Sequence, residues 1–399
     1  MRDVVVLSGS LHPELTKLIC RHLTTNEGEV LLTKFANGET LIEIKESVRE
    51  KDVFIVQLGC GHVNDNLIEL LIMLLACKTA SAKRVTAVLP LFPYSRQPDI
   101  PHLAALTGAP KKTTFNFELR PPTRALTPAP GDLLAPMTPK RTDSTTKISA
   151  PNPIKGLLKN IATTDAAGRT ELGYKQWIAQ NGTLIANLLT RAGADRVITM
   201  DLHDPQFQGY FDICVDNLHL KPLFKNWIIE HIPHYHQCVI VLPDSGGAKR
   251  AIAVADALGC PFALIHKERR AKYGTGAEGT PESNPKVVAT TMLVGDVKDK
   301  VCVLVDDLAD TAYTITQAAK LLKDQGAKQI YALVAHGIFS GEAIRRIEHS
   351  AIDKLVTTNS TLLQPGANFE VLDVLRVFAE AIRRIHNGES VSMLFDHGW

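Results

Sequence analysis

The chain has 399 residues, which is enough for two ordinary domains with apolar cores of their own. Its 44 Lys and Arg residues nearly balance its 42 Asp and Glu residues, so the charge gives no indication of a nucleic-acid partner. The seven cysteines are scattered without a CxxC pair, which favours reduced core thiols over a disulfide framework or a zinc site.

The sequence also bears on where the protein resides. The first residues, MRDVVVLSGS, lack the apolar region of a signal peptide. The longest apolar stretch, residues 67–77, contains Glu69 and is too short to span a bilayer. We therefore expect a soluble cytoplasmic protein with no membrane partner.

Short apolar runs that suit buried strands alternate with helical patterns along most of the chain. One helix is expected to end near His22, and another to cover residues 64–77 with Asn64 or Asp65 as its cap. This alternation is typical of α/β proteins with doubly wound parallel sheets, here in two layers of similar size. Strands are predicted at residues 4–7, 53–57, 85–91, 197–200, 238–242, 262–265, 301–305 and 330–335.

Two segments break the alternation. From residue 101 to residue 165 the periodicity disappears, and ten of the 22 prolines fall between Pro101 and Pro153. Such a segment buries too little apolar surface to offset its ordering entropy, which predicts a largely disordered insertion. A second low-complexity stretch, YGTGAEGTPESNP at residues 273–285, predicts a mobile loop.

The stretch VCVLVDDLADTAYTIT at residues 301–316 has the outline of a phosphate-ester site. A buried strand is followed at once by Asp306 and Asp307, then by a hydroxyl-rich loop and the start of a helix. A helix N-terminus attracts phosphate, and paired carboxylates can hold sugar hydroxyls or a hard cation. The alternative is an ordinary strand-to-helix turn in which an Asp caps the helix.

A second group of polar residues surrounds ITMDLHD at residues 198–204. Asp201 and His203 are two residues apart at a strand end, so they are expected to face the same side. Asp212 and Asp216 follow four residues apart. The alternative is a histidine in a turn beside solvated acids.

Several motifs together resemble those of ribose-phosphate diphosphokinases, also called PRPP synthetases, in a eukaryotic, fungal-like form with insertions. The resemblance covers about three quarters of the chain. Its motifs are FANGET, NDNLIELLIM, FPYSRQ, ITMDLHDPQFQGYFDICVDNL, PDSGGAKR, ALIHKERR, MLVGDVKDK, the DDLADTAYT loop, HGIFSG and EAIRRIHNGES.

The resemblance implies two tandem domains similar to type I phosphoribosyltransferases. Residues 1–220 would form an N-terminal ATP-binding domain, with the disordered insertion at 101–165. Residues 221–380 would form a C-terminal ribose-5-phosphate domain, and residues 381–399 would pack back on the N-terminal domain. The implied reaction is Mg²⁺-dependent transfer of the diphosphoryl group of ATP to C1 of ribose 5-phosphate, giving PRPP and AMP.

The resemblance also implies roles for individual residues. The implied catalytic residues are Lys267, Arg269 and His203. The implied ATP-binding residues are Phe35, Asn37, Glu39, Arg96, Gln97 and His203, the first three donated by a neighbouring subunit. The implied ribose-5-phosphate residues are Asp244, Asp306, Asp307, Asp310, Thr311, Ala312, Tyr313 and Thr314. The implied metal residues are Asp201, His203, Asp212 and Asp216, and the implied regulatory-phosphate residues are Ser47, Arg49, Ser390 and Ser392.

Without the resemblance, simpler interpretations of two of these motifs remain open. HKERR at residues 266–270 has the composition of a solvated surface run, and Asn37–Gly38 is by itself a strong hairpin-turn signal.

The chain departs from the family pattern at one informative position. Tyr313, in DTAYT, stands where the family has Gly, and Gly permits a positive φ and a close approach to phosphate. This departure and the insertion favour an alternative: a weakly active or inactive regulatory or scaffold subunit of a hetero-oligomeric synthetase. A homo- or hetero-oligomer is expected in either case. A third possibility is a phosphoribosyltransferase that consumes PRPP. It is disfavoured, because such an enzyme would have no use for the FANGET and MDLH motifs.

Overall fold

The computed structural model describes residues 3–96, 181–243, 248–272, 286–363 and 369–396, together with two short strands at 162–164 and 170–172. At 162–164, 170–172, 248–249, 267–272, 286–291 and 396 only the backbone is described. The two short strands, β6 (Ala162–Thr164) and β7 (Thr170–Leu172), pair antiparallel. The rest of the expected insertion at 101–165 and the expected loop at 273–285 lie outside the described residues.

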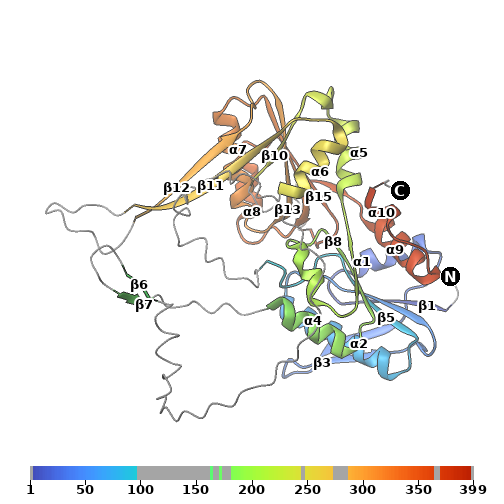
Figure 1. The fold of residues 1–399 in the computed structure, drawn as a ribbon. Helices are drawn as coiled ribbons and strands as arrows, with labels where there is room; N and C mark the ends of the chain where they lie inside the picture. The colour runs from blue at the N-terminus through green and yellow to red at the C-terminus, as the bar shows by residue number, and fades with distance from the viewer. Residues whose placement is uncertain are drawn as a thin grey trace, which may run out of the picture. The chain divides into compact units, whose positions relative to one another are not determined.

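The N-terminal half of the chain forms one parallel sheet, which lies in the lower part of Figure 1. Apolar side chains alternate between its two faces, and both faces are covered. Helices α2 (Val63–Thr79) and α4 (Asn181–Ala192) pack on one face, and α1 (Pro13–His22) covers the other. The strands, in spatial order, are β1 (Val4–Ser8), β4 (Asp52–Val56), β5 (Arg84–Leu89), β8 (Arg196–Met200) and β9 (Cys214–Leu218).

The C-terminal half forms a second sheet, in the upper part of Figure 1. The strand order reverses beside β10, because the chain continues to β11 on one side of β10 and then returns to β13 on the other. Ligands of open α/β sheets bind outside the carboxyl ends of the strands at such a reversal. In spatial order the strands are β12 (Lys286–Val294), β11 (Phe262–Lys272), β10 (Val239–Leu242), β13 (Val301–Ala309), β14 (Gln329–Gly337), β15 (Lys354–Thr358) and β16 (Glu370–Leu372).

The predicted α/β class with parallel sheets is therefore confirmed, and each predicted strand forms. The antiparallel β11–β12 pair at the sheet edge is the exception to parallel pairing in the second sheet. The remaining helices of the described chain are α5 (Lys221–His231), α6 (Ala248–Leu258), α7 (Tyr313–Asp324), α8 (Ala343–Glu348), α9 (Leu375–Asn387) and α10 (Met393–Asp396), with 3₁₀ turns at Pro205–Tyr210 and Tyr235–Gln237.

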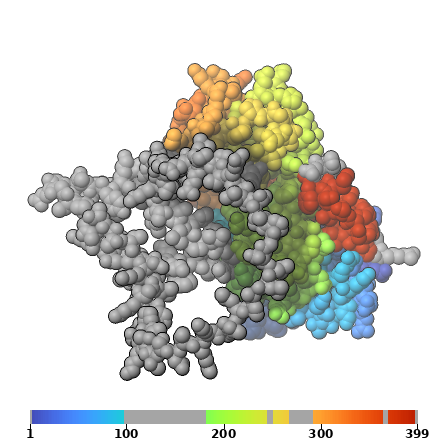
Figure 2. Space-filling view, viewed as in Figure 1, coloured from blue at the N-terminus to red at the C-terminus, as the bar shows by residue number. Residues whose placement is uncertain are grey.

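One apolar cluster runs from the first sheet into the second, so the two halves share a core. It joins Phe54 and Met200 of the first sheet to Leu242 and Val303 of the second. The C-terminal helix α9 belongs to the same cluster and packs against α1. In Figure 2 the red C-terminal helices accordingly lie beside blue and cyan residues of the N-terminal half.

The start of α2 differs from the expectation that Asn64 or Asp65 caps it. The helix begins at Val63, one residue earlier, and His62 precedes it without a side-chain capping bond. Both expected caps lie in the first turn and have other partners. Asn64 accepts a hydrogen bond from the Tyr94 hydroxyl, and Asp65 forms an ion pair with Lys34.

Six of the seven cysteines are buried free thiols, and Cys214 at the start of β9 is exposed. Burial raises the pKa of the Cys20 and Cys77 thiols to about 12. Within the described residues, no helix combines the length and the apolar character that a bilayer crossing requires.

Candidate functional site

The acidic pair of the 301–316 stretch lies within a strand rather than in a turn. β13 continues past the apolar run to Ala309 because β14 offers an edge to pair with, and Asp306 lies opposite Val334. As a result Asp307 is only 4 % exposed, and Asp306 is buried as well. A carboxylate this deeply buried requires charged or hydrogen-bonding partners.

The main partner of Asp307 comes from the other half of the chain. His203 follows β8, and its Nδ1 lies 2.7 Å from Asp307 Oδ2. The hydrogen bond to Asp307 raises the pKa of His203, whereas burial acts in the opposite direction. Burial alone would raise the pKa of Asp307, but the bond to His203 and the charge of Arg250 outweigh it and lower the pKa. The contact joins two motifs that are 104 residues apart.

Arg250, in the first turn of α6, completes this cluster. Its Nη1 lies 3.1 Å from Asp307 Oδ1, its Nη2 donates to the Leu202 carbonyl at 3.1 Å, and its Nε lies 3.6 Å from Asp201 Oδ1. Arg250 is not among the site residues expected from the sequence. Its place in PDSGGAKR, at the start of an apolar helix after a strand, was the signal that could have found it.

Asp201 and His203 do not face the same partners, although both follow β8. The Asp201 backbone is left-handed, with φ +38°, which marks local strain of the kind found at functional sites. One of its oxygens accepts from the Leu220 amide at 3.0 Å, and the other lies 3.3 Å from His219 Nδ1. The His203 side chain remains 43 % exposed, so His203 is the more accessible of the two.

His336, a further histidine with no role expected from the sequence, connects the end of β14 to β8. His336 is buried, its Nε2 lies 3.0 Å from the Met200 carbonyl, and its Nδ1 lies 2.7 Å from Ser360 Oγ. Burial lowers the pKa of His336, and because a carbonyl oxygen can only accept, Nε2 carries the proton of the bond to Met200. It lies in the HGIFSG motif.

The structure does not bring Asp212 and Asp216 to this cluster. Asp216 pairs with Arg196 from within the sheet, opposite Ile198, and Asp212 precedes β9. Because β8 and β9 are parallel, Asp212 lies at the opposite edge of the sheet from Asp201. A spacing of four residues would place both acids on one face of a helix, but this segment enters a strand.

The hydroxyl-rich loop leads directly into α7. Asp310 precedes it and forms an ion pair with Arg96, which lies in the loop after β5. Burial alone would raise the pKa of Asp310, but hydrogen bonds from Ser340 and Arg96 lower it. The Thr311 carbonyl accepts from Arg346, which fixes the loop beside α8.

The left-handed residue of this loop is Ala312, with φ +56°, and not Tyr313. The expectation that Tyr313 bears the positive φ is therefore wrong. Tyr313 is the first residue of α7, and its ring is 61 % exposed. The left-handed conformation, which is unfavourable for residues other than Gly, therefore falls on Ala312, one position before Tyr313.

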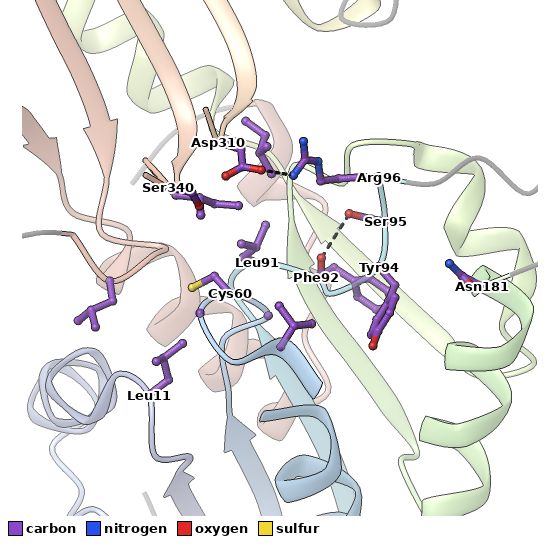
Figure 3. A pocket seen from close by; sticks show the side chains of 16 residues that line it. Leu11, Cys60, Leu91, Phe92, Tyr94, Ser95, Arg96, Asn181, Asp310 and Ser340 are labelled. Carbon is purple, nitrogen blue, oxygen red and sulfur yellow. Dashed lines mark hydrogen bonds and ion pairs between the residues drawn. The ribbon is translucent and has the colours of Figure 1, made fainter. Parts of the chain in front are cut away.

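A cavity of about 580 Å³ adjoins the ion pair of Arg96 and Asp310 (Figure 3). Its lining comes from loops at the carboxyl ends of strands in both sheets and is mostly apolar, with Leu11, Leu91 and Cys60 among its residues. Ser95, beside Arg96, is held by a bond to the Phe92 carbonyl. The cavity thus has an apolar body and a charged rim.

FANGET forms the turn of the hairpin between β2 (Val30–Lys34) and β3 (Thr40–Ile44), as its Asn37–Gly38 signal predicts. The Phe35 amide donates to the Glu39 carbonyl at 2.8 Å, and Asn37 Oδ1 accepts from the Glu39 amide at 3.1 Å. The ring of Phe35 is exposed. An exposed aromatic ring at a rigid turn can stack on a flat ligand.

The other expected site residues fall into two groups. Ser390 and Ser392 are exposed and bonded to each other at 2.8 Å, and Ser47 and Arg49 are exposed. The backbone of Lys267 and Arg269 lies in β11, opposite Thr291 and Ala289, so these residues belong to a long two-stranded ribbon. Their side chains, and all of Gln97 and Asp244, lie outside the described residues.

Comparison with known proteins gives matches along the chain. A family model for the N-terminal domain of ribose phosphate pyrophosphokinase matches residues 4–104, and one for the phosphoribosyl synthetase-associated domain matches residues 234–396. The chain is 49 % identical to ribose-phosphate pyrophosphokinase 5 of Schizosaccharomyces pombe over all 399 residues, which is 98 % of that protein. The structure is similar to the crystal structure of phosphoribosylpyrophosphate synthetase from Mycobacterium smegmatis, with a TM-score of 0.72 and 29 % identity over 97 % of this chain and 100 % of that one.

Proposed function

The chain belongs to the ribose-phosphate pyrophosphokinase family, and from this premise we propose how its residues carry out the reaction. ATP and ribose 5-phosphate bind where the carboxyl ends of the two sheets meet. The diphosphoryl group of ATP passes to the C1 hydroxyl of ribose 5-phosphate, giving PRPP and AMP. The observation that carries the proposal is the contact of Asp307 with His203, which joins the acidic pair of β13 to the MDLH motif.

The pentose phosphate is assigned to the segment from β13 to α7. The N-terminus of α7 presents backbone N–H groups and the positive end of the helix dipole, which suit the 5-phosphate. Thr311, Ala312, Tyr313 and Thr314 would surround that phosphate. Asp306 and Asp310, with Asp244 and Asp307, would orient the sugar hydroxyls.

ATP is assigned to the side of the site formed by β5 and β8. Arg96 is suited to the polyphosphate because its guanidinium is always charged, and the exposed ring of His203 offers Nε2, since its Nδ1 is engaged by Asp307. Gln97 would lie beside Arg96. Phe35, Asn37 and Glu39 of a neighbouring subunit would hold the adenine, which requires an oligomer.

Mg²⁺ is assigned to the Asp201–His203 segment. Among the residues that the structure describes, no group of three or more His, Cys, Asp or Glu side chains is arranged to hold a metal ion by itself. A Mg²⁺ that also binds phosphate oxygens needs only one or two carboxylates from the protein. The donor types fit, because Asp201, Asp306 and Asp307 are carboxylates and hard cations take oxygen ligands. When bound, the ion would neutralise polyphosphate charge. Asp212 and Asp216 lie outside the cluster of Asp201 and His203, so we do not assign them to this ion.

The transfer itself needs positive charge that is placed before the reaction. The C1 oxygen forms a bond to the β-phosphorus and loses its proton to solvent. The bond from the β-phosphorus to the oxygen that bridges it to the α-phosphorus breaks, and AMP leaves with that oxygen. Negative charge grows on the equatorial oxygens and on AMP, and fixed cations stabilise it. Lys267 and Arg269 are assigned this task. The regulatory-phosphate role of Ser47, Arg49, Ser390 and Ser392 stays a prediction.

The test is AMP release by the purified chain alone with ATP, Mg²⁺ and ribose 5-phosphate. Lys267→Ala is expected to lower turnover on the order of 100-fold while ATP binding is retained, because its charge acts mainly in the transition state. Lys17→Ala, which removes an exposed lysine on α1, is the matched control and should leave turnover unchanged. No AMP from the unaltered chain would favour the regulatory or scaffold subunit instead. Equal turnover in the two variants would remove the role of Lys267.

A further inference from the structure

We propose that Arg250 is a positioning residue for this reaction, acting on His203 through Asp307 and through the Leu202 backbone. The inference rests on the proposed function, because it assumes that His203 faces the polyphosphate. It adds a residue to the site that does not itself touch substrate. It also gives Asp307 a role beyond sugar binding, as the carboxylate that orients His203.

The contacts of Arg250 reach both sides of the His203 segment. Its Nη2 donates to the Leu202 carbonyl, the residue before His203, at 3.1 Å. Its Nη1 holds Asp307 Oδ1 at 3.1 Å, and the other oxygen of the same carboxylate meets His203 Nδ1 at 2.7 Å. One guanidinium therefore fixes both the backbone before His203 and the carboxylate that holds its ring.

Burial makes this arrangement specific to arginine. The Arg250 side chain is 17 % exposed, and Asp201 and Asp307 beside it are almost fully buried. A buried carboxylate is stable only when its charge is matched and its oxygens are hydrogen-bonded. The planar fork of arginine can serve Asp201, Leu202 and Asp307 at once, whereas a lysine ammonium is a single point of charge on a flexible stem.

The orientation of His203 follows from these bonds. Because Nδ1 is engaged by Asp307, the ring directs Nε2 away from the buried carboxylate, and the ring is the more exposed part of the cluster. At metal sites, a carboxylate that orients a ligating histidine in this way typically contributes about 10- to 100-fold to metal affinity or activity, and we take the same range here. If Arg250 is lost, Asp307 loses the cation that holds its other oxygen, and the His203 ring is no longer held in one direction.

A double-mutant cycle distinguishes a role of Arg250 in orienting His203 from a role in the stability of the fold alone. Arg250→Gln is expected to lower kcat for AMP release by about 10- to 100-fold. Since both changes remove the same orientation, Arg250→Gln combined with His203→Gln should be no slower than the slower single variant. Arg84→Gln is the matched control, because Arg84 pairs with the buried Asp52 at the opposite end of the first sheet. It should lower the melting temperature yet keep kcat within about twofold of the unaltered chain, as expected for a substitution remote from the site.

Each other outcome is decisive. If the losses of kcat in the two single variants add in the double variant, or if Arg84→Gln loses as much kcat as Arg250→Gln, the proposal is overturned. Arg250 would then have a structural role only. If Arg250→Gln fails to fold, Arg250→Lys takes its place, and a kcat equal to that of the unaltered chain would overturn the proposal. If the unaltered chain releases no AMP, the proposed function fails by itself. The same cycle is then measured on MgATP affinity by calorimetry, where additive losses would overturn the role of Arg250.

Discussion

Asp52→Asn tests the ion-pair group that connects the C-terminal helix to the first sheet. Asp52 begins β4 and is only 3 % exposed. It accepts from Arg84 Nε at 2.8 Å and a second time from the same guanidinium, and it lies 2.7 Å from His386 Nδ1 in α9. Asparagine keeps the shape but removes the charge, so the perturbation is electrostatic.

The magnitude follows from the burial of the partners. Removing one member of a fully buried ion pair costs about 3–5 kcal/mol. Arg84 is 41 % exposed, so water can solvate its charge after the substitution, and we expect a loss nearer 2 kcal/mol. With an unfolding entropy of about 2.1 cal/mol/K per residue, a loss of that size corresponds to a fall of about 2–4 °C in Tm for a chain of 399 residues whose two halves share a core. Calorimetry at pH 7 measures it.

The effect should also depend on pH. Burial alone would raise the pKa of Asp52, but hydrogen bonds from Arg84 and His386 lower it below its ordinary value. A carboxyl group with a lowered folded-state pKa stabilises the fold fully above its unfolded pKa and loses that contribution as the pH falls through the folded value. The difference in Tm between the two proteins should therefore shrink below about pH 4.

The control is Glu342→Gln, since the pair of Glu342 with Arg345 is almost fully exposed and should change stability by less than about 1 kcal/mol. Equal Tm values for Asp52→Asn and the unaltered chain at pH 7 would refute the reasoning. A difference that stays constant as the pH falls to 3 would refute the electrostatic part of it.

Three further predictions concern single positions. Gly59→Ala places a Cβ 2.6 Å from the Pro93 nitrogen, so it should lower both Tm and the rate of AMP release. An unchanged Tm would show that the loop rearranges without a loss of stability. Phe35→Ala should raise KM for ATP about tenfold, the loss expected when a stacking ring worth about 1–2 kcal/mol is removed, with Tm unchanged; an unchanged KM would remove the stacking role. A thiol reagent should modify one cysteine quickly in the native chain and none in Cys214→Ser, because the other six are buried; several fast thiols would contradict this burial.

The sequence by itself determined the strands and the nature of the chemistry. Short apolar runs such as VCVLV are buried on both sides only in a sheet that is covered on both faces. Their positions could therefore be predicted without knowing which strands lie beside them. The motifs also indicated which kinds of side chain gather at the strand ends. The Asn37–Gly38 turn was likewise predictable, because its geometry depends only on adjacent residues.

The tertiary structure decided which of these residues meet. β13 extends through Asp306 and Asp307 because β14 lies alongside it, and the paired residues are 28 positions apart, which no local pattern reveals. The parallel pairing of β8 with β9 placed Asp212 at the opposite sheet edge from Asp201, and the packing of the two halves put Arg250 between Asp201 and Asp307. Local preferences depend on neighbours in the chain, whereas charge pairing depends on distance and burial, and both are set only when the two sheets pack together.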